Sequence, residues 1–111
     1  MALEVEQIRS LEMSELNLIT KLADWYSQQC NGEWEHRSGI DIGTLDNPGW
    51  ILKVNLRETP LEAVKFEPIS ATKGESDWID CQKRDGQFVG AGDPSKLALI
   101  LEHFLRFAGK L

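Results

Sequence analysis

The chain has 111 residues, of which 41% are hydrophobic and 27% are charged, and its formal net charge is −6. These values are typical of one globular domain and exclude a disordered chain. No apolar run approaches the roughly 20 residues that span a membrane, and no secretion signal is visible at the N-terminus. The two cysteines lack the spacing of zinc or redox sites. We therefore expect a cytoplasmic protein with reduced thiols and without a membrane span.

The negative charge belongs to the first half of the chain. Residues 1–50 contain three basic and nine acidic residues, whereas residues 51–111 contain nine of each. An acidic surface repels the phosphates of nucleic acid and suits a basic partner. The same charge is also compatible with a role in solubility alone. The charge thus disfavours nucleic acid as a ligand and leaves these two interpretations open.

We interpret residues 1–13 as a lead-in and residues 14–111 as a single domain. The first predicted element is an amphipathic helix from Ser14 to about Cys30, because its apolar residues fill one half of the helical wheel. Ser14 is a suitable N-cap, and Asn31-Gly32 is a typical helix end. Since Cys30 lies on the apolar side, we expect its thiol to be buried and unreactive.

Five strands are predicted after this helix from turn signals and from the alternation of apolar and polar residues. They comprise residues 38–45, 50–57, 61–67, 77–84 and 87–91. Pro48-Gly49 predicts a type II turn between the first two strands, and Asp85-Gly86 predicts a tight turn between the last two. In the second strand, Trp50 and every second residue after it are apolar, which places Trp50 on the core side.

A second helix is predicted from Asp93 to Ala108, with Asp93 as N-cap, Pro94 in the first turn and Gly109 after its end. The order of elements predicts an α+β fold. We expect a four- or five-stranded antiparallel meander sheet, with the N-terminal and C-terminal helices packed on one face. The other face of the sheet would be polar and open to a partner.

The sequence was also compared with the patterns of catalytic and ligand sites. The segment 90–96 matches neither phosphate-binding pattern and is better explained as a tight turn. Cys30, Glu35 and His36 lie close together in the sequence, but they do not form a zinc ligand set. A pocket that uses these three residues, in a small enzyme or a small-ligand-binding protein, is the alternative function. We favour a protein that is not an enzyme and has no metal or cofactor.

The region from residue 30 to residue 50 concentrates tryptophan and acidic side chains. A large aromatic side chain surrounded by charge is typical of a binding hot spot. The partner-binding candidates are Glu33, Trp34, Glu35, His36, Asp41, Asp46 and Asn47. Trp34 shows no alternation and is equally compatible with a core and an interface position.

The same region carries a family resemblance. Its two motifs are WYxxxCNGEWEH at residues 25–36 and GIxIxTLDNPGW at residues 39–50. With the glycine-containing turns of residues 85–92 and the C-terminal helix, they resemble the immunity protein 53 family over about residues 16–108. In the family pattern, aspartate is usual at the positions of Asn31 and Glu33.

The resemblance implies a function for the predicted domain. Residues 14–111 would form an immunity-protein-like domain from a bacterial polymorphic toxin system. Such a protein acts in the cytoplasm and neutralises a cognate toxin by protein–protein interaction. The acidic first half of the chain, and not the resemblance, suits a toxin that is basic, such as a nuclease. The oligomeric state stays open.

Overall fold

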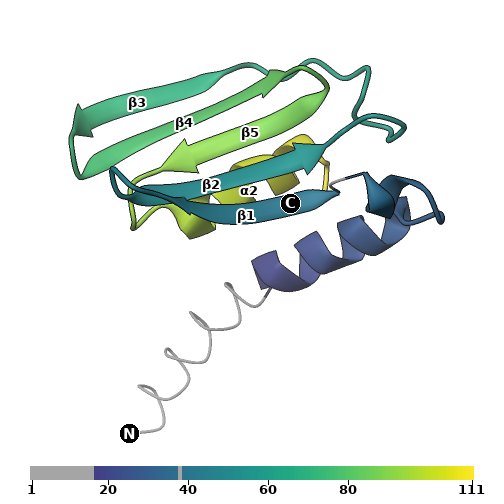
Figure 1. Ribbon diagram of the computed structural model, residues 1–111. Helices are drawn as coiled ribbons and strands as arrows, with labels where there is room; N and C mark the ends of the chain where they lie inside the picture. Colours follow the sequence, from purple (N-terminus) through teal and green to yellow (C-terminus); the bar gives the residue numbers. More distant parts are fainter. Residues whose placement is uncertain (1–16, 38) are drawn as a thin grey trace, which may run out of the picture.

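The computed structural model describes residues 17–37 and 39–111 (Figure 1). Residues 17–29 are helical, and a short 3-10 helix, η1 (Trp34–His36), precedes the sheet. The remaining elements are β1 (Ile40–Leu45), β2 (Gly49–Asn55), β3 (Ile69–Gly74), β4 (Asp77–Arg84), β5 (Gln87–Gly92) and α2 (Leu97–Phe107). The α+β class, with five antiparallel strands between two helices, is therefore confirmed. The predicted lead-in at residues 1–13 and the predicted N-cap Ser14 lie outside the described residues.

The strands form one antiparallel sheet in the order β1-β2-β5-β4-β3. This order differs from a sequential meander because β5, and not β3, pairs with β2. Residues 56–68 carry the chain from β2 to the far edge of the sheet, where β3 begins (Figure 1). The β4 prediction is confirmed residue for residue, and β1, β2 and β5 overlap their predicted ranges.

The strand predicted at residues 61–67 is wrong, because this segment belongs to the connection between β2 and β3. Its carbonyl oxygens are bound by a side chain and not by a neighbouring strand. Lys83 Nζ donates to the carbonyl oxygens of Leu61, Glu62 and Val64 over 3.0, 2.6 and 2.6 Å. One lysine of β4 thus fixes the connection in a curved path.

The core lies between the sheet and the helices. Its fully buried side chains include members of β2, β4, β5 and α2, among them Leu52, Val54, Cys81, Phe88, Ile100 and Phe104. Trp25 of the N-terminal helix meets Phe104 edge to face, with ring centroids 5.0 Å apart. Gly90 has no side chain where α2 approaches, and a Cβ there would lie 2.7 Å from Ile100 Cγ2. Trp50 is partly buried and packs against this core.

The turn between β1 and β2 differs from the predicted type II turn. Residues 46–48 form the turn, whereas Gly49 already pairs with Leu45 as the first residue of β2. The positive φ angles among the described glycines are at Gly32, Gly86 and Gly109, so Gly49 does not occupy the left-handed position that a type II turn requires. The Asp85-Gly86 turn does have positive φ at both residues, as its sequence predicts.

Within the described residues, no helix combines the length and the apolar character that a membrane crossing requires.

Candidate partner-binding surface

The loop that leads from the N-terminal helix into η1 is held by two of its own side chains. Asn31 Oδ1 accepts hydrogen bonds from the backbone N–H groups of Glu33 (2.9 Å) and Trp34 (3.0 Å). The Glu35 carboxylate accepts hydrogen bonds from the backbone N–H groups of Asn31 (2.9 Å) and Gly32 (2.7 Å). Either asparagine or aspartate could supply the acceptor at position 31, because both side chains carry an Oδ1 oxygen.

These hydrogen bonds determine the state of Glu35. Backbone N–H groups, first its own and then those of Asn31 and Gly32, lower the pKa of the Glu35 carboxyl. The carboxylate form is therefore favoured, and its two oxygens are already occupied by the loop. Glu35 shapes the loop that presents its neighbours.

Trp34 is a core residue and not a surface anchor. Only 1% of its surface is exposed, because η1 turns the indole inward beneath the N-terminal helix. Its ring lies edge to face with Trp25 and tilted against Tyr26, at centroid distances of 5.8 and 5.6 Å. Its Nε1 donates a hydrogen bond to the carbonyl oxygen of Asn55 over 3.2 Å. Of the two interpretations that the sequence allowed, the structure selects the core.

The other predicted residues do not form one compact patch. Glu33 and His36 are exposed at the η1 end of β1, where Arg37 lies 3.9 Å from the Glu33 carboxylate. Asp46 and Asn47 are exposed in the turn at the opposite end. The six residues of β1 separate the two groups by about 20 Å, at roughly 3.3 Å per residue.

Asp41 lies on β1 between these two groups. It pairs with Lys53 in the register of β1 and β2. Their neighbours Ile40 and Val54 face the core, so Asp41 and Lys53 face the opposite side of the sheet. This side, which we name the open face, is not covered by either described helix (Figure 1).

The open face is less polar than the sequence predicted. Because side chains alternate along a strand, the neighbours of each core residue in β1, β2, β4 and β5 point to the open face. Its apolar members are Leu45, Ile51, Trp78, Val89 and Ala91, all partly or fully buried. Asp80 and Gln82 continue the face along β4 beyond Trp78. A mixed apolar and charged face that no helix of the described residues covers is suited to protein binding.

A cavity of about 720 Å³ lies at the end of the sheet that holds the β1–β2 and β3–β4 turns. We name it the Trp78 basin, and its lining residues are Asn47, Thr72, Gly74, Glu75 and Trp78. The basin thus joins one of the predicted residues, Asn47, to a tryptophan that was not among the predicted site residues.

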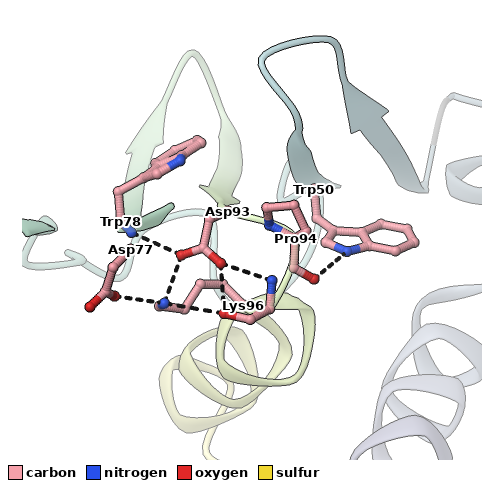
Figure 2. A network of polar contacts seen from close by, with 7 residues as sticks. Trp50, Asp77, Trp78, Asp93, Pro94 and Lys96 are labelled. Carbon is pink, nitrogen blue, oxygen red and sulfur yellow. Dashed lines mark hydrogen bonds and ion pairs between the residues drawn. The ribbon is translucent and has the colours of Figure 1, made fainter. Parts of the chain in front are cut away.

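A buried ionic cluster holds the start of β4 beneath this basin (Figure 2). Asp93, which is 1% exposed, accepts hydrogen bonds from the backbone N–H of Trp78 (2.9 Å) and from Lys96 Nζ (2.7 Å). Its other oxygen accepts hydrogen bonds from the Ser95 backbone N–H (2.8 Å) and hydroxyl (2.6 Å). Lys96 Nζ also lies 2.8 Å from Asp77 Oδ1. The cluster therefore joins β4 to the connection between β5 and α2.

The electrostatics of this cluster favour its charged state. Hydrogen bonds from Lys96, and next from Ser95, lower the pKa of Asp93. Hydrogen bonds to Asp77 and Asp93 raise the pKa of Lys96. The Asp93 side chain binds Trp78, Ser95 and Lys96, so the prediction that it caps the C-terminal helix is wrong. The helix α2 begins at Leu97, after Lys96 at the N-cap position.

Two side chains of the alternative catalytic site, Cys30 and Glu35, make local hydrogen bonds. Cys30 is exposed, contrary to the prediction, because it follows the last helical residue, and its Sγ donates to the Tyr26 carbonyl oxygen over 3.3 Å. Glu35 is engaged by its own loop. A cavity of about 210 Å³ beside η1 is lined by Arg37, Arg57 and their neighbours, and not by these residues. In residues 17–37 and 39–111, no cluster of three His, Cys, Asp or Glu side chains could hold a metal ion.

The fold and the open face define a small acidic α+β protein with a surface suited to protein binding. The model of the immunity protein 53 family matches residues 19–109. The chain therefore belongs to the immunity protein 53 family. No match was found among the curated proteins or among the solved structures.

Sequence reasoning did not include Trp78 among the site residues, although the signal was present. In β4, Trp78 and Asp80 lie on one side of the strand, and Ile79 and Cys81 lie on the other. This pattern places an indole on the polar side of a strand. An aromatic residue on a polar face is a better indicator of a binding surface than a tryptophan in a loop.

Proposed function

We propose that the protein neutralises a cognate bacterial toxin by binding it, and that it acts in the cytoplasm without catalysing a reaction. Membership of the immunity protein 53 family is the observation that carries this proposal. The open face supports it, because a sheet face that no described helix covers offers a rigid contact surface. The excess of acidic residues in the first half of the chain supports a basic partner, such as a nuclease toxin.

The proposed contact surface extends along β1 from one end to the other. At the η1 end it contains Glu33 and His36, which the Glu35-bound loop presents to solvent. Asp41 lies between them and the turn residues Asp46 and Asn47. A standard interface buries about 800 Å² on each partner, which corresponds to a patch roughly 30 Å across. A single toxin domain could therefore contact both ends of β1.

The salt dependence of toxin binding can separate this proposal from a role of the acidic residues in solubility alone. Steering by an acidic surface accelerates association at low ionic strength, and salt screens it over about 10 Å at 0.1 M. If the acidic residues select the toxin, the association rate should fall with added salt. If they only keep the protein in solution, the association rate should be nearly independent of salt.

The first experiment uses the toxin encoded in the neighbouring reading frame. Co-expression with the immunity protein should restore the growth of cells that produce this toxin, and the purified pair should form a stable complex. Absence of both protection and complex formation would overturn the proposal. The second experiment compares two variants of equal net charge. The Asp41→Asn/Asp46→Asn variant should associate with the toxin more slowly, whereas Glu67→Gln/Glu102→Gln should associate as the wild type does.

A further inference from the structure

We infer that the Trp78 basin receives an arginine side chain carried by a loop of the toxin. This inference rests on the proposed toxin-binding function and assigns a specific contact within it. The basin combines a fixed indole, carboxylates around it and space for a short segment of chain, and each of these features has a separate origin in the structure.

Two contacts hold Trp78 in place, one made by its backbone and one made by its ring. The backbone N–H of Trp78 donates to Asp93, and the ring points away from this ionic cluster (Figure 2). On the open face the ring lies against Gly49, since a Cβ at that residue would be 3.3 Å from Trp78 Cζ2. A side chain that is ordered before binding loses little conformational entropy in the complex. Trp78 is therefore preorganised as an anchor.

One carboxylate lines the basin together with the indole, and two others lie on neighbouring residues of the sheet and its turn. Glu75 lines the basin, and Asp46 precedes the lining residue Asn47. Asp80 lies two residues along β4 from Trp78 and therefore on the same face. An aromatic ring bordered by carboxylates attracts a cation through the ring quadrupole and through charge pairing.

The nearest positive charges do not cancel this preference. Lys96 is already paired with Asp77 and Asp93, 2.8 and 2.7 Å away. Lys73 is the extra residue of a bulge in β3 and is adjacent in sequence to the basin residue Thr72. Glu75 is the one charged residue among those that line the basin, so the lining itself is negative. An anionic ligand would be repelled, whereas a guanidinium group can stack on the indole and bind a carboxylate in the same plane.

The size of the basin indicates that the arginine enters with its loop. The basin is an open depression of about 720 Å³, which is wider than a single side chain needs. The β1–β2 and β3–β4 turns border this space, so a protruding loop can reach it from the end of the sheet. A toxin loop with arginine at its tip fits both the charge and the volume.

The first test measures the cation preference of the basin on the intact protein. N-acetyl-arginine amide is titrated into ¹⁵N-labelled protein, and the four indole N–H signals are followed by NMR, with Trp78→Phe to assign its signal. The Trp78 signal should shift with arginine and shift much less with N-acetyl-citrulline amide, which has the same shape without the charge. Equal shifts with both compounds, or no shift with arginine, would overturn the inference.

Charge variants localise the effect. Glu75→Gln should weaken arginine binding about two- to fivefold, the range that one exposed ion pair supports. Glu67→Gln removes the same charge from an exposed glutamate outside the basin and should leave binding unchanged. If both variants weaken binding equally, the effect comes from net charge, and the basin has no specific role.

The second test uses the complex with the toxin encoded in the neighbouring reading frame. Trp78→Ala should weaken the complex about 30-fold or more, as expected for a central aromatic anchor. Glu75→Arg places a cation in an exposed turn, where folding tolerates it, and should weaken the complex at least tenfold. If the complex forms and both variants bind as the wild type does, the inference fails while the proposed function stands. If the wild-type protein forms no complex, both fail.

Discussion

Replacement of Trp34 by alanine should destabilise the protein severely, because the indole fills the core where the N-terminal helix meets η1. The ring is 1% exposed, lies against Trp25 and Tyr26, and donates a hydrogen bond to the Asn55 carbonyl oxygen. Loss of about 150–200 Å² of buried apolar surface, at roughly 25 cal/mol per Å², costs about 4–5 kcal/mol. This figure agrees with the ~3–5 kcal/mol range of buried tryptophan-to-alanine changes. A protein of this length has an unfolding free energy of about 6–17 kcal/mol, so the variant should lose between roughly a quarter and most of its stability.

The measurement is equilibrium unfolding in urea, followed by the far-ultraviolet circular dichroism of the backbone so that loss of one fluorophore does not affect the signal. Trp78→Ala is the matched control, because it removes a ring of the same size from a partly exposed position. We expect it to cost less than about 2 kcal/mol, nearer to the average substitution than to a core truncation. Trp34→Phe keeps an aromatic ring and loses the N–H donor, and should cost about 1–2 kcal/mol.

The opposite order of stabilities would refute this assignment. If Trp34→Ala lost less than about 1 kcal/mol and Trp78→Ala lost several, Trp34 would be the exposed ring and Trp78 the core ring. The expected order also has a practical consequence for interface mapping. A loss of toxin binding by Trp34→Ala would report unfolding and would not identify a contact.

Three further predictions concern pH, thiol chemistry and a glycine. Because its pKa lies below the ordinary value near 3.8, Asp93 stabilises the fold fully above about pH 4 and less as pH falls. The stability deficit of Asp93→Asn in urea should shrink from pH 5 to pH 2, and a constant deficit would contradict this sign. Cys30 should react with a thiol reagent in the native protein, whereas burial and the Asp80 charge raise the pKa of Cys81 to about 12 and protect it; mass spectrometry after brief alkylation should find one modified cysteine. Gly49→Ala should lose about 1–3 kcal/mol in the same urea assay, since its Cβ would collide with a carbonyl oxygen of β5; an unchanged midpoint would show that the strands separate at no cost.

The parts of the fold that sequence predicts correctly are those with a clear local period. β4 alternates between buried and half-buried residues around Ile79 and Cys81, and the predicted range matches it at both ends. β3 gives no such signal, because five of its six residues are exposed and neither face is apolar. The segment before it misleads for the opposite reason. Phe66 packs on Phe88 and Phe107 from the connection between β2 and β3, at centroid distances of 5.3 and 5.1 Å, and so imitates a strand residue.

The site was less predictable because its geometry depends on contacts between distant segments. The sequence Asp93-Pro94 matches a helix start, but the backbone N–H of Trp78, 15 residues earlier, binds the Asp93 side chain instead. Likewise, no local pattern determines whether Trp34 faces inward, since its neighbours Trp25 and Tyr26 belong to another element. Composition predicted the acidic character of the surface, but not which end of the sheet contains the cavity.

The two motifs that carry the family resemblance contribute to different parts of the structure, one to the core and one to the sheet and the Trp78 basin. The motif at residues 25–36 is mainly structural, because it contains the buried Trp25 and Trp34 and the two side chains that hold the loop. The motif at residues 39–50 forms β1 and its turn, and it supplies Asn47 to the Trp78 basin. The remaining basin residues, 72–78, lie outside both motifs. The two motifs build the framework of the fold, and the β3–β4 hairpin completes the Trp78 basin. A substitution in residues 72–75 should therefore change which partner binds while the fold is retained.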